Sequence, residues 1–443
     1  MISRINKLFN QIARRQVFRF ASSIDRDAIV IREENSQTRF GPAEGFEIEA
    51  EIDVINSAFY RRVASGPVAF GESFVDGDWD SKNLTEVIRV LLRNRALIDA
   101  VRNRWSASLS NLGRRATHLL RRNSRSGSKK NIVAHYDLGN EFYSLWLDPT
   151  MAYSAGIFLD PSKSMEDASV EKFDRICRKL ELNQHDHVVE IGTGWGGFAI
   201  HAAQKYGCRV TTTTISDRQY SMAKKRIKEL GLQNQIQVLN QDYRQLEGTY
   251  SKLVSIEMIE AVGHQYLDEY FRKCASLLSE GGSMLIQAIV MPERGYDRYL
   301  RSVDFMQKHI FPGGCLPSVS SLLESVGRTS TLRWAHGEDM GLHYAETLKH
   351  WRVSFENRLE QIRQLGCGED LIRAWRYYLS YCEAAFAERA IGVMQLQFDH
   401  AACRRDPMRI GEQAASYSLA DHLKRRSDEQ SCGENDATTF LGR

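Results

Sequence analysis

Residues 187–197 read HVVEIGTGWGG, and this stretch decides the fold. HVVEI is a short apolar run of the length of a buried strand, and the residues from Gly197 to 206 have a helical pattern. The glycines between them let the backbone turn tightly and approach a ligand closely. Since open parallel sheets bind ligands beyond the carboxyl ends of their strands, the order strand, glycine turn and helix predicts a ligand-binding loop.

The spacing of the glycines indicates the kind of ligand. A dinucleotide site has the pattern G-x-G-x-x-G, which rests a pyrophosphate on the helix N-terminus. Here Gly192, Gly194 and Gly196 follow one another at every second position, and Glu190 precedes the first. A carboxylate beside the loop favours a nucleoside with a charged amino-acid tail over a pyrophosphate. A plain tight turn stays open as the alternative from this motif alone.

The next strand also departs from the dinucleotide pattern. A dinucleotide fold usually places an acid for the ribose about 20 residues after the loop. In this chain the second strand instead ends Thr214-Ile215-Ser216-Asp217, with Gln219 close by. Neutral polar groups at this point can hold a ribose or an amino-acid tail.

Beyond residue 170, helical and strand patterns alternate. Strands are expected at 187–191, 209–215, 236–240, 252–258 and 283–291, and helices at 170–182, 197–206, 217–230 and 266–278. Such alternation predicts an α/β fold, a Rossmann-like core with a parallel sheet and helices on both faces. The chain beyond 340 is expected to add long helices at 343–365 and 369–389.

The N-terminal part has a different character. Residues 25–110 indicate a small mixed α/β domain with strands at 28–32 and 46–52 and a helix at 84–105. Residues 113–130 carry seven Lys and Arg and no acid, which predicts an exposed basic linker. The expected organisation is therefore an N-terminal domain (1–112), the linker (113–130), a catalytic domain (131–403) and a disordered tail (404–443).

The charge is uneven along the chain. The formal net charge is +3, yet residues 1–135 contain 23 Lys and Arg against 15 Asp and Glu. An anionic partner is expected, either a membrane surface or a nucleic acid. No apolar run reaches the roughly 20 residues of a membrane-spanning helix. The first 20 residues lack acids and carry apolar residues at helical spacing, so they fit a membrane-surface helix, a presequence or an ordinary first helix.

The cysteines favour a reducing compartment. The eight cysteines are scattered, none forms a C-x-x-C pair, and no spacing matches a zinc site. No metal is expected.

Several longer segments resemble one family. They are GPVAFGESFVDGDWD (66–80), NIVAHYDLGNEFYSLWLDPTMAYS (131–154), VVEIGTGWGGFAI (188–200), TTISDRQ (213–219), QDYRQL (241–246), SIEMIEAVGHQYLDEYF (255–271) and IFPGGCLPS (310–318). Over roughly residues 60–400 the chain resembles the cyclopropane fatty acid synthase family, which includes phospholipid-modifying enzymes and mycolic acid cyclopropane synthases. Its IEAVG form is similar to plant-type members.

The resemblance implies an S-adenosylmethionine (SAM)-dependent C-methyltransferase. The implied acceptor is the cis double bond of an unsaturated acyl chain in a membrane phospholipid, and the implied product is a cyclopropane ring formed through a carbocation. A methyl- or methylene-branched chain, a soluble acceptor, and a relative without turnover remain alternatives. We expect a cytoplasmic protein that is peripherally associated with the inner membrane face and binds an anionic surface but no nucleic acid. A homodimer is left open.

The resemblance also assigns the methyl donor's site residue by residue. The glycine loop cradles the methionine portion of SAM, the polar groups after the second strand follow, and the segment at 241–246 frames the adenine. The cofactor-binding residues expected in this way are Tyr153, Ser154, Glu190, Gly192, Thr193, Gly194, Trp195, Gly196, Thr214, Ser216, Gln219, Asp242 and Tyr243.

The family uses a bound bicarbonate as the base that deprotonates the carbocation. The resemblance places its cradle at Glu260, Gln287, Ile289 and Tyr344, with Cys382 as a further active-site residue. Two cradle positions depart from the bacterial pattern, because Ala155 replaces a cysteine and Gln287 a histidine. Plant-type members also have Gln at the position of Gln287, so it is the Ala155 change that puts in question how an anion is held here. Aromatic faces can shield a carbocation, and the candidates are Tyr136, Phe142, Tyr143, Trp146, Phe158, Tyr299, Phe305, Phe311 and Trp351.

Overall fold

The structure, a computed structural model, describes residues 2–94 and 138–404 of the 443-residue chain. The predicted basic linker at 113–130 lies outside the described residues. So does nearly all of the predicted tail at 404–443.

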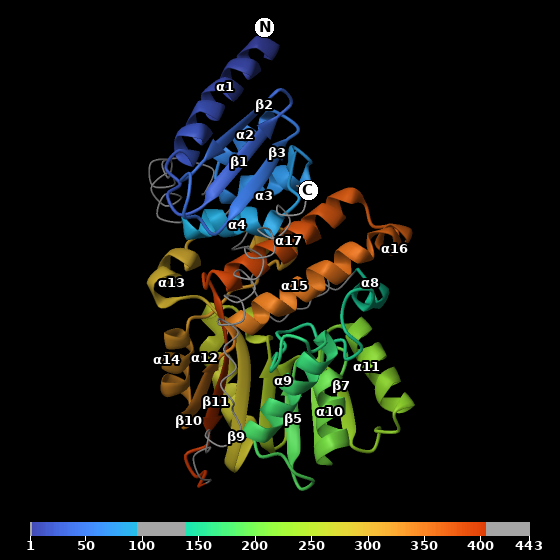
Figure 1. The fold of residues 1–443 in the computed structure, drawn as a ribbon. Helices are drawn as coiled ribbons and strands as arrows, with labels where there is room; N and C mark the ends of the chain where they lie inside the picture. Colours follow the sequence, from blue (N-terminus) through green and yellow to red (C-terminus); the bar gives the residue numbers. More distant parts are fainter. Residues whose placement is uncertain (1, 95–137, 405–443) are drawn as a thin grey trace, which may run out of the picture.

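A four-stranded sheet with helices around it forms the N-terminal unit, drawn in blue in Figure 1. The strand order is β2-β1-β3-β4, with β1 parallel to β3 and antiparallel to β2. The strands are β1 (Ala28–Glu33), β2 (Ser36–Phe40), β3 (Glu49–Val54) and β4 (Trp79–Asp80); the helices are α1 (Ile2–Ala21), α2 (Ala58–Ala64), α3 (Pro67–Val75) and α4 (Leu84–Arg93). The mixed α/β character expected for this region is present.

Helix α4 covers the first part of the expected helix at 84–105, and residues 95–105 lie outside the described residues. It ends at Arg93, because Asn94 leaves the helical conformation. The Asn94 side chain donates a hydrogen bond to the Val90 carbonyl, 2.8 Å away, and so satisfies one of the last carbonyls of α4.

A seven-stranded sheet forms the larger unit, in the order β10-β11-β9-β8-β5-β6-β7. The strands are β5 (His187–Ile191), β6 (Arg209–Thr214), β7 (Ile236–Asn240), β8 (Tyr250–Ile256), β9 (Leu278–Val290), β10 (Arg333–Asp339) and β11 (Gly392–Asp399). The neighbours from β7 to β9 are parallel, whereas β11 and β10 are antiparallel. Strands β6 and β7 lie on one side of β5, and β8 and β9 lie on the other. The strand order therefore reverses between β5 and β8, and a ligand is expected in the crevice at their carboxyl ends.

Two elements of this sheet depart from the sequence-based expectation. The chain beyond 340 is not all helical, because β11 follows the last long helix and pairs with β9 over eight residues. The edge strand β10 was also not expected. Its side chains are mostly exposed or half-buried, so the sequence lacks the apolar run of a central strand.

The sheet separates two hydrophobic cores, because successive residues of a strand point to opposite faces. Val188 of β5 packs in the core with α9 (Met165–Lys179) and α10 (Gly197–Tyr206), while Val189 packs in the core with α12 (Leu267–Leu277) and α14 (Val319–Thr329). In β9, Leu285 packs in the same core as Val188, and Met284 packs in the same core as Val189. Helices therefore cover both faces, as the alternating pattern predicted. The remaining helices of the larger unit are α8 (Asn140–Ser144), α11 (Asp217–Glu229), α13 (Glu293–Leu300), α15 (Gly341–Asn357), α16 (Leu359–Gln364) and α17 (Glu369–Ala387).

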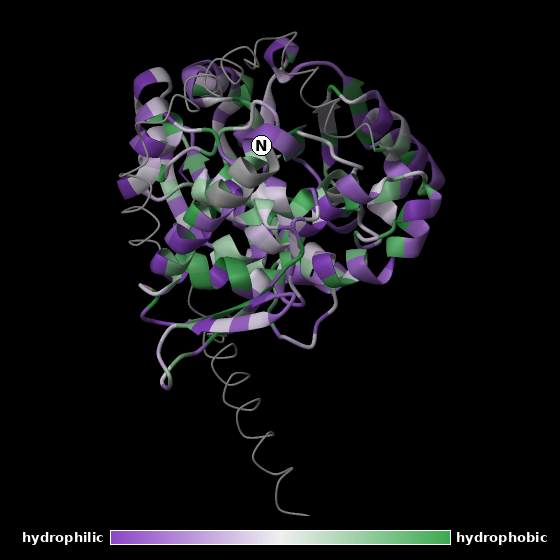
Figure 2. Ribbon diagram, turned by 90° about the horizontal axis from the view of Figure 1, so that it is seen from above, coloured by the Kyte–Doolittle hydropathy of each residue, from purple (hydrophilic) through white to green (hydrophobic). Residues whose placement is uncertain are grey.

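A third core joins the two units. Buried residues of α1, the small sheet and α4 belong to the same cluster as buried residues of α8, α15 and α17. Figure 1 shows α15 and α17, in orange and red, between the small sheet and the large one. Viewed from above in Figure 2, the outer helices carry many hydrophilic residues, and hydrophobic segments gather between them.

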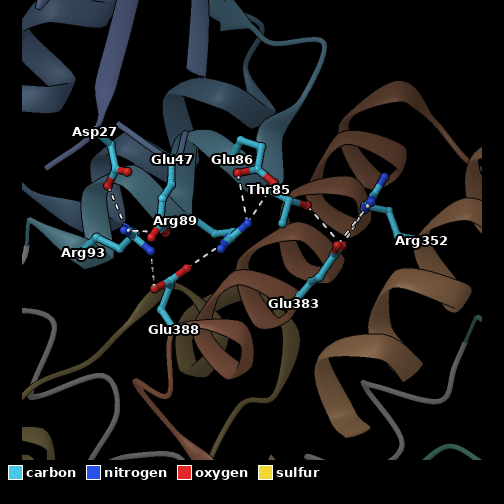
Figure 3. A network of polar contacts seen from close by, with 9 residues as sticks. All are labelled: Asp27, Glu47, Thr85, Glu86, Arg89, Arg93, Arg352, Glu383 and Glu388. Carbon is cyan, nitrogen blue, oxygen red and sulfur yellow. Dashed lines mark hydrogen bonds and ion pairs between the residues drawn. The ribbon is translucent and has the colours of Figure 1, made fainter. Parts of the chain in front are cut away.

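Polar contacts line the same junction (Figure 3). Glu383 of α17 accepts hydrogen bonds from Thr85 of α4 at 3.1 Å and from Arg352 of α15 at 2.6 Å. Arg89 of α4 donates to Glu388 at 2.7 Å, just after the end of α17. These bonds fix α4 on α17.

Among the described residues, no helix is long and apolar enough to cross a membrane.

Candidate active site

A single cavity of about 1780 Å³ lies at the carboxyl ends of β5, β6, β8 and β9 and continues into the N-terminal unit. Its sheet end is lined by the glycine loop, by residues that follow the strands and by side chains of α15 and α17. Its far end is mainly apolar, with Gln16, Arg19, Ser23 and Ser65 among its lining residues, and includes Val17, Ile24, Ile29, Ile31, Ile52 and Phe59. A typical small-molecule pocket occupies about 300–1,000 Å³, so this cavity has room for more than one ligand.

The glycine loop adopts a conformation that needs glycine. Gly192 and Gly194 have φ values of 102° and 52°, and the Gly192 and Thr193 amides both donate to the Thr213 carbonyl at 3.0 Å. A Cβ atom at Gly192 would also lie 3.3 Å from the Met258 side chain. The loop is therefore held against β6 with its open side toward the cavity.

Glu190 lies beneath this loop and is 2% exposed. Its Oε2 accepts a hydrogen bond of 2.6 Å from the Thr212 hydroxyl, which also lies 2.7 Å from the Thr193 hydroxyl. Burial raises the pKa of Glu190 to about 8, against the smaller opposing effects of the Thr212 hydroxyl and the Lys172 charge.

The polar groups after β6 contact one another. The Thr214 hydroxyl donates to Gln219 Oε1 at 3.0 Å, and the Ser216 hydroxyl accepts the Gln219 amide at the start of α11. Thr214 and Gln219 line the cavity, whereas Ser216 serves as the helix cap.

The segment expected to frame an adenine lies on the other side of the loop. Both carboxylate oxygens of Asp242 contact the Arg244 guanidinium, at 2.8 and 2.7 Å, and Tyr243 packs against Tyr270. Asp242 and Tyr243 both line the cavity.

Side chains from the segment before α9 and from the glycine loop complete this end of the cavity. The Tyr153 hydroxyl lies 2.9 Å from the Tyr378 hydroxyl, and Ser154 accepts a 2.6 Å hydrogen bond from Lys172. Trp195 donates its indole N–H to Asn140 at 2.8 Å. Of the residues expected to bind the methyl donor, all except Gly196 and Ser216 line the cavity.

A carboxylate that was not among the predicted site residues lies at the centre of the cradle. Glu257 Oε1 accepts hydrogen bonds from the Ala155 amide at 2.8 Å and from Gln287 Nε2 at 2.7 Å, and Oε2 accepts from the Tyr344 hydroxyl at 2.7 Å. The sequence did hold a signal for it, since Glu257 comes directly after β8 and three residues before Glu260.

The backbone of Glu257 is also unusual. Its φ of 48° is in the left-handed region, which a residue with a side chain rarely adopts and which costs about 1–3 kcal/mol. Its amide donates to the Gln287 carbonyl at 2.7 Å and holds this conformation. Strained residues of this kind cluster at functional sites.

Glu260 contacts a different part of the cradle. Its Oε1 accepts a 2.5 Å hydrogen bond from the Ile289 amide, and its Oε2 is buried without a hydrogen-bond partner in the described structure. Burial raises the pKa of Glu260 to about 8, and the negative charge of Glu257 adds to this increase. At neutral pH Glu260 is therefore mainly protonated.

A buried lysine, which the sequence did not single out, supplies the opposite charge. Lys172 of α9 is 0% exposed, and its charge interacts favourably with Glu257, Asp148 and Glu190. Burial lowers the pKa of Lys172 to about 8, so the ammonium stays mainly charged at neutral pH. Burial also raises the pKa of Glu257, while its three hydrogen bonds and Lys172 act in the opposite direction.

The cradle does not fit an exogenous bicarbonate. Gln287 and Tyr344 already donate to Glu257, and the Ile289 amide already donates to Glu260. A second anion in this place would compete for the same donors and would meet a carboxylate. Cys382 lines the cavity, and burial raises the pKa of its thiol far above the usual value, so the thiol stays neutral.

The aromatic candidates divide into two groups. Tyr299, Phe305 and Phe311 line the cavity. Five others, namely Phe142, Tyr143, Trp146, Phe158 and Trp351, are buried in the fold and do not line it, and Tyr136 lies outside the described residues. Tyr377, Tyr378 and Tyr381 of α17 are lining aromatics that the sequence did not single out.

Comparison with known proteins gives consistent results. The family model described as mycolic acid cyclopropane synthetase matches residues 123–396. The chain is 35% identical to tuberculostearic acid methyltransferase of Mycobacterium tuberculosis, over 76% of this chain and 80% of that protein. It is 33% identical to cyclopropane-fatty-acyl-phospholipid synthase of Escherichia coli, over 82% of this chain and 91% of that protein.

Solved structures show the same likeness. A mycolic acid cyclopropane synthase in complex with SAH and CTAB is similar with a TM-score of 0.58 and 28% identity. The similarity covers 61% of this chain and 98% of that one.

Proposed function

The chain belongs to the mycolic acid cyclopropane synthetase family and is a SAM-dependent methyltransferase, and from this premise we propose that its acceptor is an unsaturated acyl chain of a membrane phospholipid. The cis double bond would receive the methyl group, and the most direct product is a cyclopropane ring.

One observation carries this proposal, namely the continuity of the cavity. The glycine loop and the carboxylates lie at one end, and apolar side chains of the small sheet, α1 and α2 lie at the other. A soluble polar acceptor has no use for such a lining, whereas an acyl chain gains roughly 0.8 kcal/mol for each buried CH₂ group. The lining thus supports a lipid acceptor over a soluble one.

The chemistry requires this enclosure. An alkene is a weak nucleophile, so its reaction with a sulfonium methyl depends on alignment and on the exclusion of water. Tyr299, Phe305 and Phe311 present aromatic rings to the same cavity, and such rings stabilise a cation by cation–π attraction.

Helix α1 is our candidate for the membrane contact. Ala13, Val17 and Ala21 are buried on one side of the helix, while Phe9 and Ile12 are 55% and 45% exposed. Arg15 and Arg19 are exposed on the same helix. Exposed apolar side chains beside arginines are typical of helices that lie on anionic lipid surfaces.

The decisive experiment supplies SAM and vesicles of a cis-unsaturated phospholipid and then identifies the modified chains. NMR or fragmentation must locate the added carbon, because a ring and a methylene branch each add one CH₂. Vesicles with saturated chains are the matched control and should give no product. A protein that binds SAM but modifies no vesicle lipid would refute the phospholipid acceptor.

The branched product is the specific alternative. The two curated relatives carry the names of a tuberculostearic acid methyltransferase and of a cyclopropane synthase, so the family context holds more than one product. The site differs from the bacterial bicarbonate pattern at Ala155 and Gln287, where a proton acceptor would be held. The position of the added carbon in the same experiment distinguishes the two outcomes.

A further inference from the structure

We propose that the Glu257 side chain is the built-in proton acceptor of the reaction and replaces the exogenous bicarbonate that the family resemblance implies. This inference rests on the proposed function, since it concerns the carbocation formed on the acyl chain. It assigns a role to a residue that neither the motifs nor the comparisons single out.

The position of Glu257 supports this role. Its two oxygens receive three hydrogen bonds, from the Ala155 amide, Gln287 and Tyr344, at 2.7–2.8 Å. Two of these donors, Gln287 and Tyr344, are residues that the resemblance assigns to the bicarbonate cradle. A planar carboxylate thus stands between donors suited to a planar oxyanion, and it lines the cavity.

Several groups around Glu257 stabilise its ionised form against burial, which raises its pKa. The facing groups are Lys172 of α9, Tyr344 of α15, Gln287 of β9 and Glu260 of the short 3-10 turn after β8. Lys172 is positively charged. The carboxylates of Glu257 and Glu260 repel each other, so the pair shares one proton. Glu257 accepts three donors and Glu260 has an unpaired oxygen, which places the negative charge on Glu257.

The step balances with the groups already named. The alkene electrons form a bond to the donor's methyl carbon, the carbon–sulfur bond breaks with its electrons on sulfur, and a neighbouring chain carbon becomes cationic. Glu257 removes a proton from the new methyl group, and the electrons of that C–H bond close the ring. If a hydride first shifts to the cationic carbon, loss of the same proton leaves a methylene branch instead.

The test compares two matched variants, Glu257→Gln and Glu260→Gln, in the full-length protein. Each removes one carboxylate and keeps the side-chain shape. Glu257→Gln should lower the rate of lipid methylation by at least ~100-fold, within the usual range for a general base, and keep SAM binding. Glu260→Gln should lower it by only about 10-fold, because its amide oxygen still accepts the Ile289 amide.

Varying the bicarbonate concentration tests whether Glu257 accepts the proton or only holds the structure together. The wild-type protein should keep its rate in CO₂-depleted buffer. Glu257→Gly leaves the three donors free and suits the φ of 48°, so this variant should fold and its low rate should rise at least ~10-fold with added bicarbonate. A purely structural Glu257 would give a loss that follows melting temperature and does not respond to bicarbonate.

Each contrary result has a distinct meaning. If the wild type needs bicarbonate, or if Glu257→Gln turns over at the wild-type rate, the inference is wrong while the lipid methyltransferase stands. If the wild type modifies no lipid in either buffer although it binds SAM, the proposed function fails and the inference falls with it.

Discussion

Two glutamates at the carboxyl side of the same sheet, buried Glu190 and half-buried Glu257, contrast with each other. Glu190 lies one residue before the end of β5, under the glycine loop, and accepts a hydrogen bond from Thr212, whose hydroxyl also contacts Thr193. Glu257, directly after β8, carries three donors and faces the open cavity. The same side chain at equivalent ends of neighbouring strands is thus a support in one place and a candidate reactive group in the other.

The difference lies in the surroundings rather than in the residue type. Glu190 receives one neutral hydroxyl, so burial dominates and the carboxyl stays protonated to about pH 8. Glu257 receives three donors, which together with the Lys172 charge that acts on both carboxyls oppose burial, although burial still raises the pKa of Glu257. A buried carboxyl can act as a base only where such donors offset the free-energy cost of burying its charge.

Replacing the shared cation should have the largest effect on this contrast. Lys172→Met keeps the side-chain volume but leaves the buried carboxylates without their counter-charge. We expect the free energy of unfolding to fall by roughly 3 kcal/mol, as when one partner of a buried ion pair is removed. Chemical denaturation measures it.

The matched control for that experiment is Lys205→Met. Lys205 forms an ion pair with Asp174 at 2.7 Å, and its side chain is 55% exposed. A surface pair of this kind contributes about 0–1 kcal/mol. Equal losses in the two variants would show that Lys172 has no special electrostatic role.

The pH dependence of stability tests the Glu190 side of the contrast. The pKa of Glu190 is about 8 when folded and near 4.5 when unfolded, so its contribution is fully present below pH 4.5 and is lost as pH rises toward 8. Glu190→Gln mimics the protonated form. Its free energy of unfolding should be close to that of the wild type at pH 5 and higher by roughly 3 kcal/mol at pH 8. A difference that does not vary with pH would mean that Glu190 is ionised in the fold.

The glycine loop allows a smaller and more local test. Gly192→Ala places a Cβ at φ 102° and 3.3 Å from Met258, so we expect SAM affinity to fall about tenfold, which equals about 1.4 kcal/mol. Calorimetry measures the affinity. Gly231→Ala is the control, because Gly231 has φ 71° with nothing within 4 Å of an added Cβ. It should lose stability but bind SAM normally; similar affinity losses would assign the effect to backbone strain alone.

The smallest effect is expected at Cys382. Its thiol is neutral and half-buried beside the cavity, so Cys382→Ala should change the methylation rate by less than about threefold. A loss as large as that of Glu257→Gln would show that Cys382 is a second reactive group in the site. Glu257 would then not be distinguished from its surroundings as the reactive residue.

Much of the catalytic fold was readable from local pattern. The apolar run at 187–191 and the glycines after it predict β5 and its turn, because strand length and φ preference are local properties. The alternating segments at 197–206, 217–230 and 236–240 match α10, α11 and β7 within a residue or two. The antiparallel strand β11 was missed, because its pairing with β9 is a contact between residues 392–399 and 283–290 that no local pattern records.

The site followed the same division. The sequence by itself determined the methyl donor's loop and the family, because those depend on residues close together in the chain. Only the tertiary structure decided what surrounds Glu257, since Ala155, Lys172, Gln287 and Tyr344 come from four separate segments. The protonation of a buried carboxyl depends on such distant neighbours, and no spacing along the chain specifies them.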